Sequence, residues 1–338
     1  MKKIRIAQIG INKYSHANTI FGTLTKFPDI FEVVGYALVE NEREECADAL
    51  HVFDGYPELT LDEILNDKSI EAVTVETDEI HLTKYATLAA KHGKHIHMEK
   101  PGSESLADFE NLINEVRRGG KVFHTGYMYR YNPYVKQILA EVKSGEFGEI
   151  HSVEAQMDCK HLPGKVIDWL ATFKGGMMFY LGCHLIDLVL QIQGEPNDIV
   201  VFNRSTGISP VHSNDFALAI FEYKNGCATV KSDASEVGGY ARRQLVVVGS
   251  KKTVELKPFE MIIEGTCGRG IYTDKTEYTS DAWMDMGVTE RVEFDRYDDM
   301  MLAFAKMVRG EIENPYTLDY ELKLFKTILR CCGMGEEK

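Results

Sequence analysis

The sequence predicts an α/β N-terminal domain with a doubly wound parallel sheet over residues 1–126. It predicts an α+β C-terminal domain with a large, open, mostly antiparallel sheet over residues 127–338. Strand-like and helix-like segments alternate as far as residue 127, which is the pattern of crossovers in a parallel sheet. After Gly126 strand patterns dominate. A chain of 338 residues has room for two domains of about 100 to 200 residues each.

The predicted N-terminal strands are short, apolar and rich in β-branched residues, as buried parallel strands usually are. In chain order they are IRIAQIG, VVGYALV, AVTVET, HIHMEK and KVFHTGY. The first helix is predicted because apolar residues recur at i, i+3, i+4 and i+7. These residues are Ala17, Ile20, Phe21 and Leu24. Thr60 and Glu63 have the spacing of a capping box, and a further helix begins near His81 and ends at Gly93.

The C-terminal domain begins with a helix that an Asn-Pro pair at 132–133 opens and Gly145 ends. Six strand patterns follow: EIHSVEAQM, DIVVFN, FALAIFEY, CATVKSDA, RRQLVVVG and TVELKP. An Asn-Gly pair at 225–226 predicts a hairpin in which these residues supply the positive φ angles. The run GGMMFYLGCHLIDLVLQIQG predicts a long helix, and a terminal helix over 318–331 is a candidate to pack back on the first domain.

The charge balance limits the classes of partner. The chain has 38 basic and 52 acidic residues and a net charge of −14, without a basic stripe. Because a polyanion would be repelled, we expect neither nucleic acid nor an anionic membrane as a partner. No apolar run is long enough to span a membrane, and the N-terminus enters a strand directly. We therefore expect a cytoplasmic protein.

The turn after the first strand holds an altered nucleotide-binding pattern. A dinucleotide fingerprint has three glycines there, so that backbone amides and a helix N-terminus can approach a pyrophosphate. This chain has Gly10, Asn12 and Ser15 at the three positions. Asn tolerates a left-handed backbone and Ser15 is a candidate N-cap. The pattern is compatible with nucleotide binding and equally with an ordinary strand-to-helix turn.

An acidic residue at the end of the second strand would hydrogen-bond the adenosine ribose of a dinucleotide. Leu38 occupies the expected position, and Glu40 is the nearest carboxylate on the same side of the strand. Glu40 would favour NAD over NADP, because it repels a 2′-phosphate. The alternative is a solvated loop glutamate.

Glu99-Lys100-Pro101 ends the apolar run HIHMEKP, just before a helical segment. In an open parallel sheet the carboxyl ends of the strands form the ligand crevice, so an amine there is a candidate acid or base. The alternative is a solvated lysine at a strand end.

The chain resembles the glucose-fructose oxidoreductase and inositol dehydrogenase (Gfo/Idh/MocA) family over nearly its whole length. The segments that carry the resemblance are AAKHGKHIHMEKP, RYNPYVKQILAEVKSGEFGEIHSVEAQ, WLATFKGGMMFYLGCHLID, VVVGSKKTVEL and DRYDDMMLAFAKMVRG. The resemblance implies a Rossmann domain that binds NAD, with NADP also possible. It also implies a second domain whose sheet carries the substrate and forms a homo-oligomer, a dimer or tetramer. The expected chemistry is hydride transfer to or from a sugar, cyclitol or related polyol.

The family's site residues fall on this chain with some departures. Its EKP motif matches Glu99 and Lys100, and its helix histidine matches His184. The aspartate expected four residues before that histidine is Tyr180 here. The nicotinamide-side pattern T-P-N-x-x-H reads ETDEIH, which places Thr77 and His81 among the implied cofactor-binding residues.

Oxidation of an alcohol needs a group that takes the hydroxyl proton as the hydride leaves. Lys100 is the first candidate and His184 is the second, because the unperturbed pKa of an imidazole is about 6.5. The alternative for His184 is a core histidine in an apolar helix. Asp187, three residues further on, is expected to orient the imidazole. Tyr180 lies four residues before His184 and either donates a proton or fills the volume of the missing aspartate.

Two residues are candidates for contact with the substrate. Arg130 follows the last parallel strand, and Trp169, shortly before the long helix, has the ring to stack on a sugar. The alternative for Arg130 is a surface cation, and the alternative for Trp169 is an aromatic residue that packs in the core. His95 and His97 alternate on one strand, but no further ligands complete a site, so we expect no metal.

Three functions remain open on the sequence alone. The first is an NAD(P)-dependent oxidoreductase of a sugar, cyclitol or polyol. The second is a lyase or glycoside-cleaving enzyme that retains NAD and causes no net redox change. The third is a non-catalytic nucleotide- or sugar-binding protein on a dehydrogenase scaffold.

Overall fold

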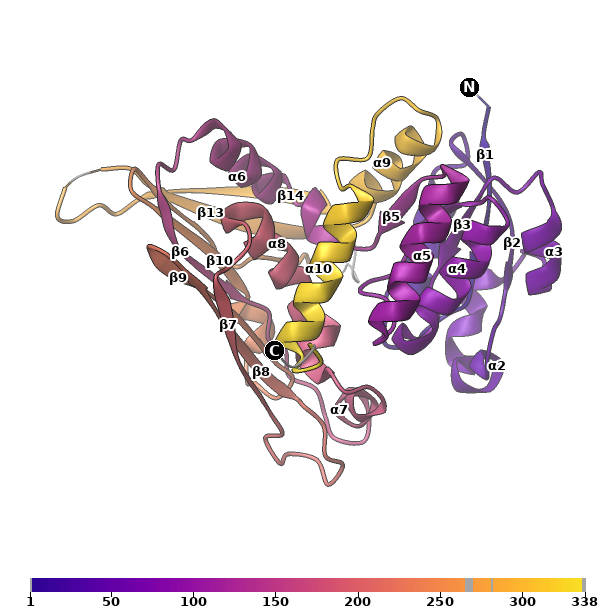
Figure 1. Cartoon of the computed structure of the whole chain (residues 1–338), viewed down its shortest axis with the longest axis horizontal. Coiled ribbons are helices and arrows are strands. Elements are labelled where there is room, and N and C mark those ends of the chain that lie inside the picture. Colours follow the sequence, from indigo (N-terminus) through magenta and orange to yellow (C-terminus); the bar gives the residue numbers. More distant parts are fainter. Residues whose placement is uncertain (1, 265–269, 281, 336–338) are drawn as a thin grey trace. The chain divides into compact units, whose positions relative to one another are not determined.

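The computed structural model describes residues 2–264, 270–280 and 282–335 (Figure 1). These residues form two compact units, each built from two stretches of the chain. The first unit contains Met1–Tyr127 and Tyr297–Phe325, and the second contains Met128–Arg296 and Lys326–Lys338. The terminal helix α10 (Leu318–Cys331) therefore begins in the first unit and ends in the second.

The first unit contains a five-stranded parallel sheet in the order β2-β1-β3-β4-β5. Its strands are β1 (Ile4–Ile9), β2 (Phe31–Ala37), β3 (Ala72–Val75), β4 (His95–Met98) and β5 (Phe123–Thr125). All five coincide with predicted strands, which confirms the doubly wound parallel sheet. The strand order reverses between β1 and β3, and ligands of such sheets bind at the carboxyl ends beside this reversal.

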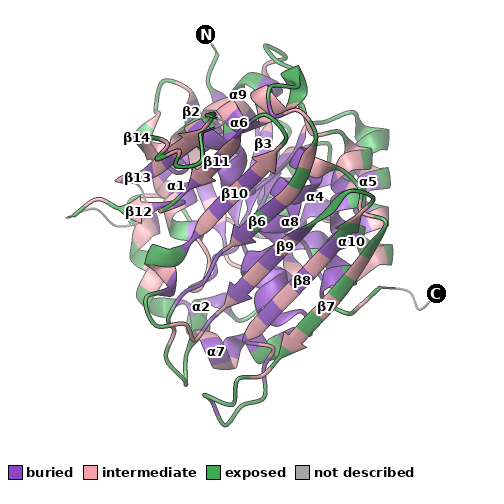
Figure 2. Ribbon diagram, turned by 90° about the vertical axis from the view of Figure 1, so that its left-hand side faces the viewer, coloured by how far each residue is buried: buried purple, intermediate pink, exposed green. Residues whose placement is uncertain are grey.

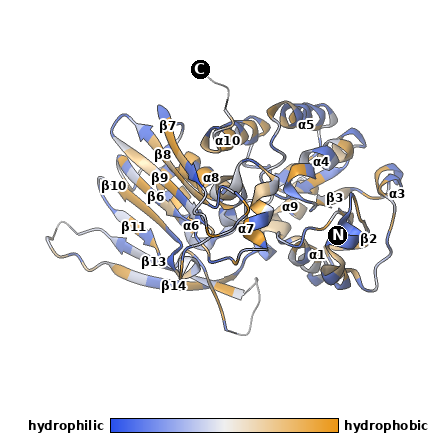
Figure 3. Ribbon diagram, turned by 90° about the horizontal axis from the view of Figure 1, so that it is seen from below, coloured by the Kyte–Doolittle hydropathy of each residue, from blue (hydrophilic) through white to orange (hydrophobic). Residues whose placement is uncertain are grey.

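Helices cover both faces of this sheet. They are α1 (Ala17–Lys26), α2 (Glu42–Glu45), α3 (Leu61–Asn66), α4 (Leu82–Lys91), α5 (Leu106–Gly119) and α9 (Asp298–Val308), with 3-10 turns η1 (Ala47–Phe53) and η2 (Glu79–His81). Helices α4 and α5 lie side by side on one face (Figures 1 and 3), and α1 lies on the other (Figure 3). Thr60 and Glu63 form the predicted capping box at the start of α3. Helix α1 begins after His16, so the prediction that Ser15 is its N-cap is wrong by one residue.

The second unit contains a nine-stranded, mostly antiparallel sheet, as predicted. Eight strands run in the order β12-β13-β11-β10-β6-β9-β8-β7, β14 pairs with β13, and only the β6–β9 pair among these strands is parallel. The strands are β6 (Ile150–Gln156), β7 (Asp198–Arg204), β8 (Phe216–Tyr223), β9 (Gly226–Asp233), β10 (Gln244–Gly249), β11 (Thr253–Leu256), β12 (Met261–Ile262), β13 (Gly270–Tyr278) and β14 (Val288–Asp295).

Helices pack on one face of this sheet (Figures 1 and 3). Helix α8 (Cys183–Gln193) lies directly against β6 and β9. The second unit also contains α6 (Pro133–Ser144), α7 (Val166–Trp169) and the short turns η3 (Met128–Tyr131), η4 (Leu170–Thr172) and η6 (Gly239–Arg242). Asn132 caps α6 by accepting hydrogen bonds from the next turn, and Gly145 ends it with φ +79°. Figure 2 shows buried residues alternating with partly exposed ones along β6, β8, β9 and β10, as expected of a sheet with one covered face.

Two details of the second unit differ from the sequence prediction. The predicted long helix is divided, because a π-helical turn, η5 (Met178–Gly182), precedes α8. The β8–β9 hairpin forms, but its two loop residues are Lys224 and Asn225, and Asn225 does not have a positive φ. Gly226 begins β9 instead. A Cβ there would lie 1.8 Å from the carbonyl oxygen of His151, so close backbone packing explains this glycine.

Within the described residues, no helix combines the length and apolar character needed to cross a membrane.

Candidate functional site

The candidate site of the first unit lies at the carboxyl ends of β1, β3 and β4. Backbone hydrogen bonds set these ends level, since Glu76 N donates to Ile9 O over 2.9 Å and Glu99 N donates to Val75 O over 3.0 Å. The residues that directly follow the three strands, Gly10, Glu76 and Glu99, therefore lie at one edge of the sheet. This edge includes the strand-order reversal between β1 and β3, where a doubly wound sheet binds its ligand.

Gly10 occupies a position that a side chain would block. Its φ is +83°, and an added Cβ would lie 2.6 Å from Thr77 Cβ and 2.8 Å from Glu42 Oε1. The predicted cofactor-binding residues Gly10 and Thr77 are thus in direct contact. Glu42, which the sequence analysis missed, folds over them and accepts a hydrogen bond from Val39 N over 2.8 Å. Burial raises the pKa of the Glu42 carboxyl to about 7.

Asn12 replaces the second glycine of the fingerprint, and its side chain is buried in a specific arrangement. Its Nδ2 donates to Glu79 Oε2 over 2.8 Å, and its Oδ1 accepts from Tyr14 N over 2.8 Å. Glu79 was also missed at the sequence level. It is fully buried, and burial raises the pKa of its carboxyl to about 8. Ser15 Oγ lies 3.4 Å from Asn12 O and from Ala17 N, so it bridges the loop to α1.

Glu40 follows β2 with φ +50°, which makes it the one non-glycine residue with positive φ in the described chain. Such backbone strain is often found at functional sites. Lys84 Nζ and Tyr85 Oη donate to the same carboxylate oxygen, Oε1, over 2.5 and 2.7 Å. His81 Nδ1 lies 3.8 Å from that oxygen. The hydrogen bond from Lys84 is the main reason why the pKa of Glu40 is lowered, so the group is ionised.

Lys100 is buried, contrary to the solvated alternative, and its Nζ lies 3.3 Å from Glu99 Oε1. Gly126 packs against this glutamate, because a Cβ there would lie 2.8 Å from Glu99 Oε2. Glu76 is fully buried, and neither carboxylate oxygen has a hydrogen-bond partner among the described residues. Burial and then repulsion by Glu99 raise the pKa of Glu76 well above its usual value.

His97 lies behind this group. Its Nε2 is 3.6 Å from Glu76 Oε1, and its Nδ1 is 2.7 Å from Nδ1 of His124, so one ring donates to the other. Burial lowers the pKa of His97 to about 3, which keeps the ring neutral at physiological pH. In the described part of the chain, no three or more His, Cys, Asp or Glu side chains form a group that could hold a metal ion.

The second unit holds the other predicted site residues. Asp187 forms a two-pronged ion pair with Arg130, whose Nε and Nη2 donate to its two oxygens over 2.9 and 2.8 Å. Asp187 also accepts from Gln191 Nε2 over 2.8 Å. Both members of the pair are buried. From the sequence, Arg130 is predicted to contact substrate and Asp187 to orient His184, and their pairing with each other is not predicted.

His184 lies against a buried polar network that the sequence analysis missed. Its ring meets the edge of Tyr129, with the centroids 5.3 Å apart. Tyr129 Oη donates to Glu260 Oε1 over 2.7 Å, and Arg243 and Arg296 also pair with Glu260. Burial alone would raise the pKa of Glu260, but the attraction of Arg296 and Arg243 outweighs it and lowers the pKa.

Tyr180 lies in the π-helical turn, so the α-helical spacing that placed it on one face with His184 does not hold across that turn. Its ring meets Trp169 edge to face, with the centroids 5.0 Å apart. Trp169 packs in the same way on Phe173 and is buried. These contacts agree with the packing alternatives for both residues, and catalytic and substrate roles stay predictions.

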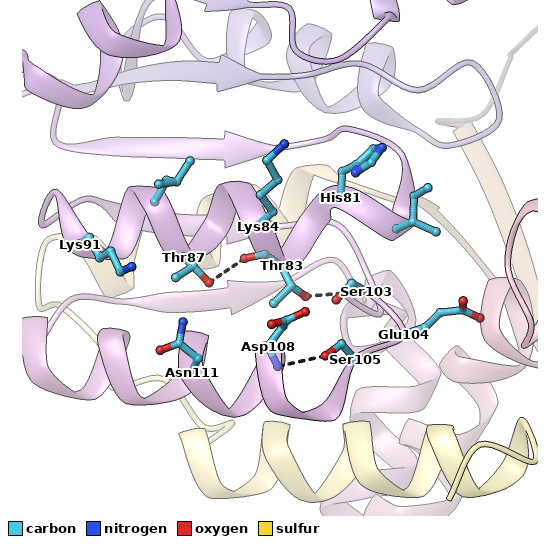
Figure 4. Close-up of a pocket in the computed structure, with 12 residues that line it drawn as sticks. His81, Thr83, Lys84, Thr87, Lys91, Ser103, Glu104, Ser105, Asp108 and Asn111 are labelled. Atoms are coloured by element: carbon cyan, nitrogen blue, oxygen red, sulfur yellow. Dashed lines mark hydrogen bonds between the residues drawn. The ribbon is translucent and has the colours of Figure 1, made fainter.

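A groove of about 740 Å³ lies between α4 and α5 (Figure 4). Two hydroxyl side chains that line it accept hydrogen bonds from the backbone: Ser103 N donates to Thr83 Oγ1 over 2.8 Å, and Asp108 N donates to Ser105 Oγ over 3.2 Å. His81 and Lys84, which contact Glu40, also line it. We assign no chemistry to this groove.

Two family models match the chain. Residues 4–127 match the model described as an oxidoreductase family with an NAD-binding Rossmann fold. Residues 135–255 match the GFO/IDH/MocA C-terminal domain. Myo-inositol 2-dehydrogenase of Thermotoga maritima is 25% identical over 256 residues, which are 73% of this chain and 73% of that protein.

Solved structures share the fold over the whole chain. Levoglucosan dehydrogenase in complex with NADH and levoglucosan superposes with a TM-score of 0.77 at 16% identity, covering 98% of this chain and 97% of the other. KijD10, a 3-ketoreductase from Actinomadura kijaniata in complex with NADP and TDP-benzene, has a TM-score of 0.76 at 17% identity, covering 97% and 96%. With the family models, these matches confirm the resemblance seen in the sequence.

Proposed function

Because this chain belongs to the Gfo/Idh/MocA family of NAD-binding oxidoreductases, we propose that it oxidises or reduces a sugar, cyclitol or related polyol by hydride transfer. The observation that carries the proposal is the position of Lys100. This buried amine follows the carboxyl end of β4, at the same edge of the sheet as Gly10. That edge is where a doubly wound sheet binds a dinucleotide.

The first unit fits such a cofactor. At Gly10 a Cβ would collide with Thr77 and Glu42, so glycine is what allows this close turn at the edge of the sheet, and Glu76 offers two buried oxygens without a hydrogen-bond partner in the described chain. When bound, NAD accepts or supplies the hydride. Gly10, Asn12, Ser15, Thr77 and His81 would surround it, together with Glu40, Glu99 and Lys100.

Glu40 supports a preference for NAD. Both of its hydrogen bonds reach Oε1, which leaves Oε2 to accept a bond from a ribose hydroxyl. A 2′-phosphate in place of that hydroxyl would meet an ionised carboxylate. Lys84 reduces this repulsion by its own charge, so we expect a preference and not exclusion of NADP.

The chain's own residues would handle the proton. We assign the neutral amine of Lys100 to take the hydroxyl proton during oxidation, which makes it the ammonium, and the ammonium to return that proton during reduction, with Glu99 fixing the group. His184 is the second proton carrier, and Tyr180 a further donor. The Arg130–Asp187 pair makes Asp187 a positioning group for α8, with Arg130 and Trp169 as candidate substrate contacts.

The outer face of the nine-stranded sheet supports the predicted homo-oligomer. Val200 and Phe202 on β7 are each 39% exposed, although both are apolar. Partly exposed Leu218 and Ile220 extend this face onto β8. Apolar area of this kind is typical of subunit contacts. Oligomer number and cytoplasmic location stay predictions.

A spectrophotometric screen tests the proposal. Purified protein is incubated with NAD or NADP and a panel of sugars, cyclitols and polyols, and absorbance at 340 nm is followed. We expect reduced cofactor to form with at least one member and faster with NAD. Conversion of a substrate without any change at 340 nm would instead support the lyase with retained NAD. If no substrate is converted and no cofactor binds, only the non-catalytic alternative remains.

A further inference from the structure

Three buried glutamates share one buried lysine at the carboxyl edge of the first sheet. Glu76 and Glu79 are fully buried, and Glu99 and Lys100 are each 3% exposed. Lys100 pairs directly with Glu99, and its charge also acts on the other two carboxyl groups. If all three glutamates were ionised, these four side chains together would carry a net charge of −2, from three carboxylates and one ammonium.

The groups around the cluster do not supply the missing positive charge. On β4, His97 faces Glu76 and is kept neutral by burial. The next ring, His124 on β5, is bonded to His97. Asp78, which precedes Glu79, adds a further negative charge, and Asn12 is a neutral donor. Since an unpaired buried charge is costly, the excess is relieved by protons held on Glu76 and Glu79.

We propose that Glu76 and Glu79 form a proton store that releases a proton when the oxidised cofactor binds. The inference rests on the proposed function, because it requires NAD at this edge of the sheet. The nicotinamide ring of NAD⁺ brings one positive charge, whereas the ring of NADH is neutral. On binding of NAD⁺ a carboxyl O–H bond breaks, its proton passes to the buffer, and the carboxylate balances the ring. Nothing is oxidised or reduced in this step.

The directions of the pKa shifts agree with this role. Burial raises the pKa of Glu79 to about 8, so this group holds its proton at pH 7, and burial raises the pKa of Glu76 well above its usual value. A nearby positive charge favours the ionised form and lowers these pKa values. NAD⁺ should therefore bind more tightly as pH rises from 6 to 8, by up to about tenfold per unit for one proton released. The affinity for NADH should change little.

Isothermal titration calorimetry of the full-length protein measures the proton directly. NAD⁺ and NADH are titrated at pH 7 in phosphate and in Tris, whose ionisation enthalpies differ, and the dependence of the binding enthalpy on the buffer gives the protons released. We expect up to about one proton per bound NAD⁺. We expect markedly fewer for NADH.

Matched variants identify the source. Glu76→Gln and Glu79→Gln resemble the protonated carboxyls, so the double variant should fold and bind NAD⁺ without proton release. Glu44→Gln, at an exposed glutamate of α2, should release as many protons as the wild type. The comparison of NAD⁺ with NADH on the wild type decides the question even if the double variant misfolds.

Equal proton release for NAD⁺ and NADH, or release that survives in the double variant, would overturn the proton store and leave the proposed function intact. If neither NAD⁺ nor NADH binds, both the proton store and the proposed function would be overturned.

Discussion

The side-chain amide of Asn12 donates a hydrogen bond to the buried carboxyl of Glu79 over 2.8 Å. Asn12 stands where the family fingerprint has its second glycine, and Glu79 belongs to the η2 turn after β3. The substitution in the glycine loop thus has a specific partner in the first unit. The pair joins the loop after β1 to the turn that leads into α4, so the residue that replaces the second glycine has a defined contact.

We expect Asn12→Ala to lower the free energy of unfolding by about 1–3 kcal/mol, because it leaves buried Glu79 without its donor. Chemical denaturation of the variant measures the loss. Asn18→Ala, at an exposed asparagine of α1, is the control. Combining Asn12→Ala with Glu79→Ala should show a coupling energy of about 0.5–3 kcal/mol. Strict additivity of the two substitutions would argue against the bond.

Glu79→Gln should change how stability depends on pH. The pKa of Glu79 is raised from 4.5 to about 8, so the folded state holds its proton more tightly than the unfolded state. The stabilisation of the folded state by this proton is complete below pH 4.5 and is lost as pH rises through 8. Relative to wild type, the variant should gain stability across this range, by at most about 1.4 kcal/mol per pH unit. Thermal melts at intervals from pH 5 to 8 measure the difference, and a constant difference would contradict it.

Glu40→Ala should shift cofactor preference towards NADP. It removes the carboxylate that repels a 2′-phosphate and leaves Lys84 beside the site. The ratio of the dissociation constants for NADP and NAD should fall about tenfold, which corresponds to 1.4 kcal/mol. Lys84→Ala should move the ratio in the opposite direction, because Glu40 then keeps its charge unbalanced. Calorimetric titration gives both ratios. If neither variant changes the ratio, the Glu40 carboxylate does not reach the ribose.

The fold was predictable because its signals are local. Each strand of the first sheet is an apolar run of a few residues, and the α3 capping box involves Thr60 and Glu63 alone. Gly10 and Lys100 could be found in the same way, since Gly10 directly follows a recognisable strand and Lys100 stands two residues after another. The alternation of strands with helices along the chain then implies a parallel sheet, without any information on long-range contacts.

The partners of the site residues were not predictable, because they are distant in the chain. Asn12 and Glu79 are 67 residues apart, Glu40 and Tyr85 are 45 apart, and Arg130 and Asp187 are 57 apart. No periodic pattern encodes such pairs. The π-helical turn around Tyr180 was missed because its sequence is compatible with an ordinary helix.

Tyr180→Phe distinguishes a working hydroxyl from packing. The ring contact with Trp169 is kept, so stability should change by less than about 0.5 kcal/mol. If the hydroxyl transfers a proton, turnover should fall by about tenfold to a hundredfold. This loss is smaller than the one expected when the principal acid or base is removed. Tyr180→Leu also removes the ring that packs on Trp169, so it should lower the free energy of unfolding. Wild-type turnover in the Phe variant would restrict Tyr180 to packing.

Turnover of Lys100→Met on the substrate identified at 340 nm is the most direct test of the proposed proton transfer by Lys100 during hydride transfer. Loss of the ammonium leaves Glu99 unpaired, so Lys100→Met combined with Glu99→Gln is measured beside it. Lys94→Met is the control, since Lys94 is another buried lysine of the first unit and bonds only backbone carbonyls of Asp67 and Ile70 in the described structure. We predict that kcat falls by about two to four orders of magnitude in both Lys100 variants. It should stay near wild type in folded Lys94→Met. Wild-type turnover without Lys100 would contradict its role as the proton carrier.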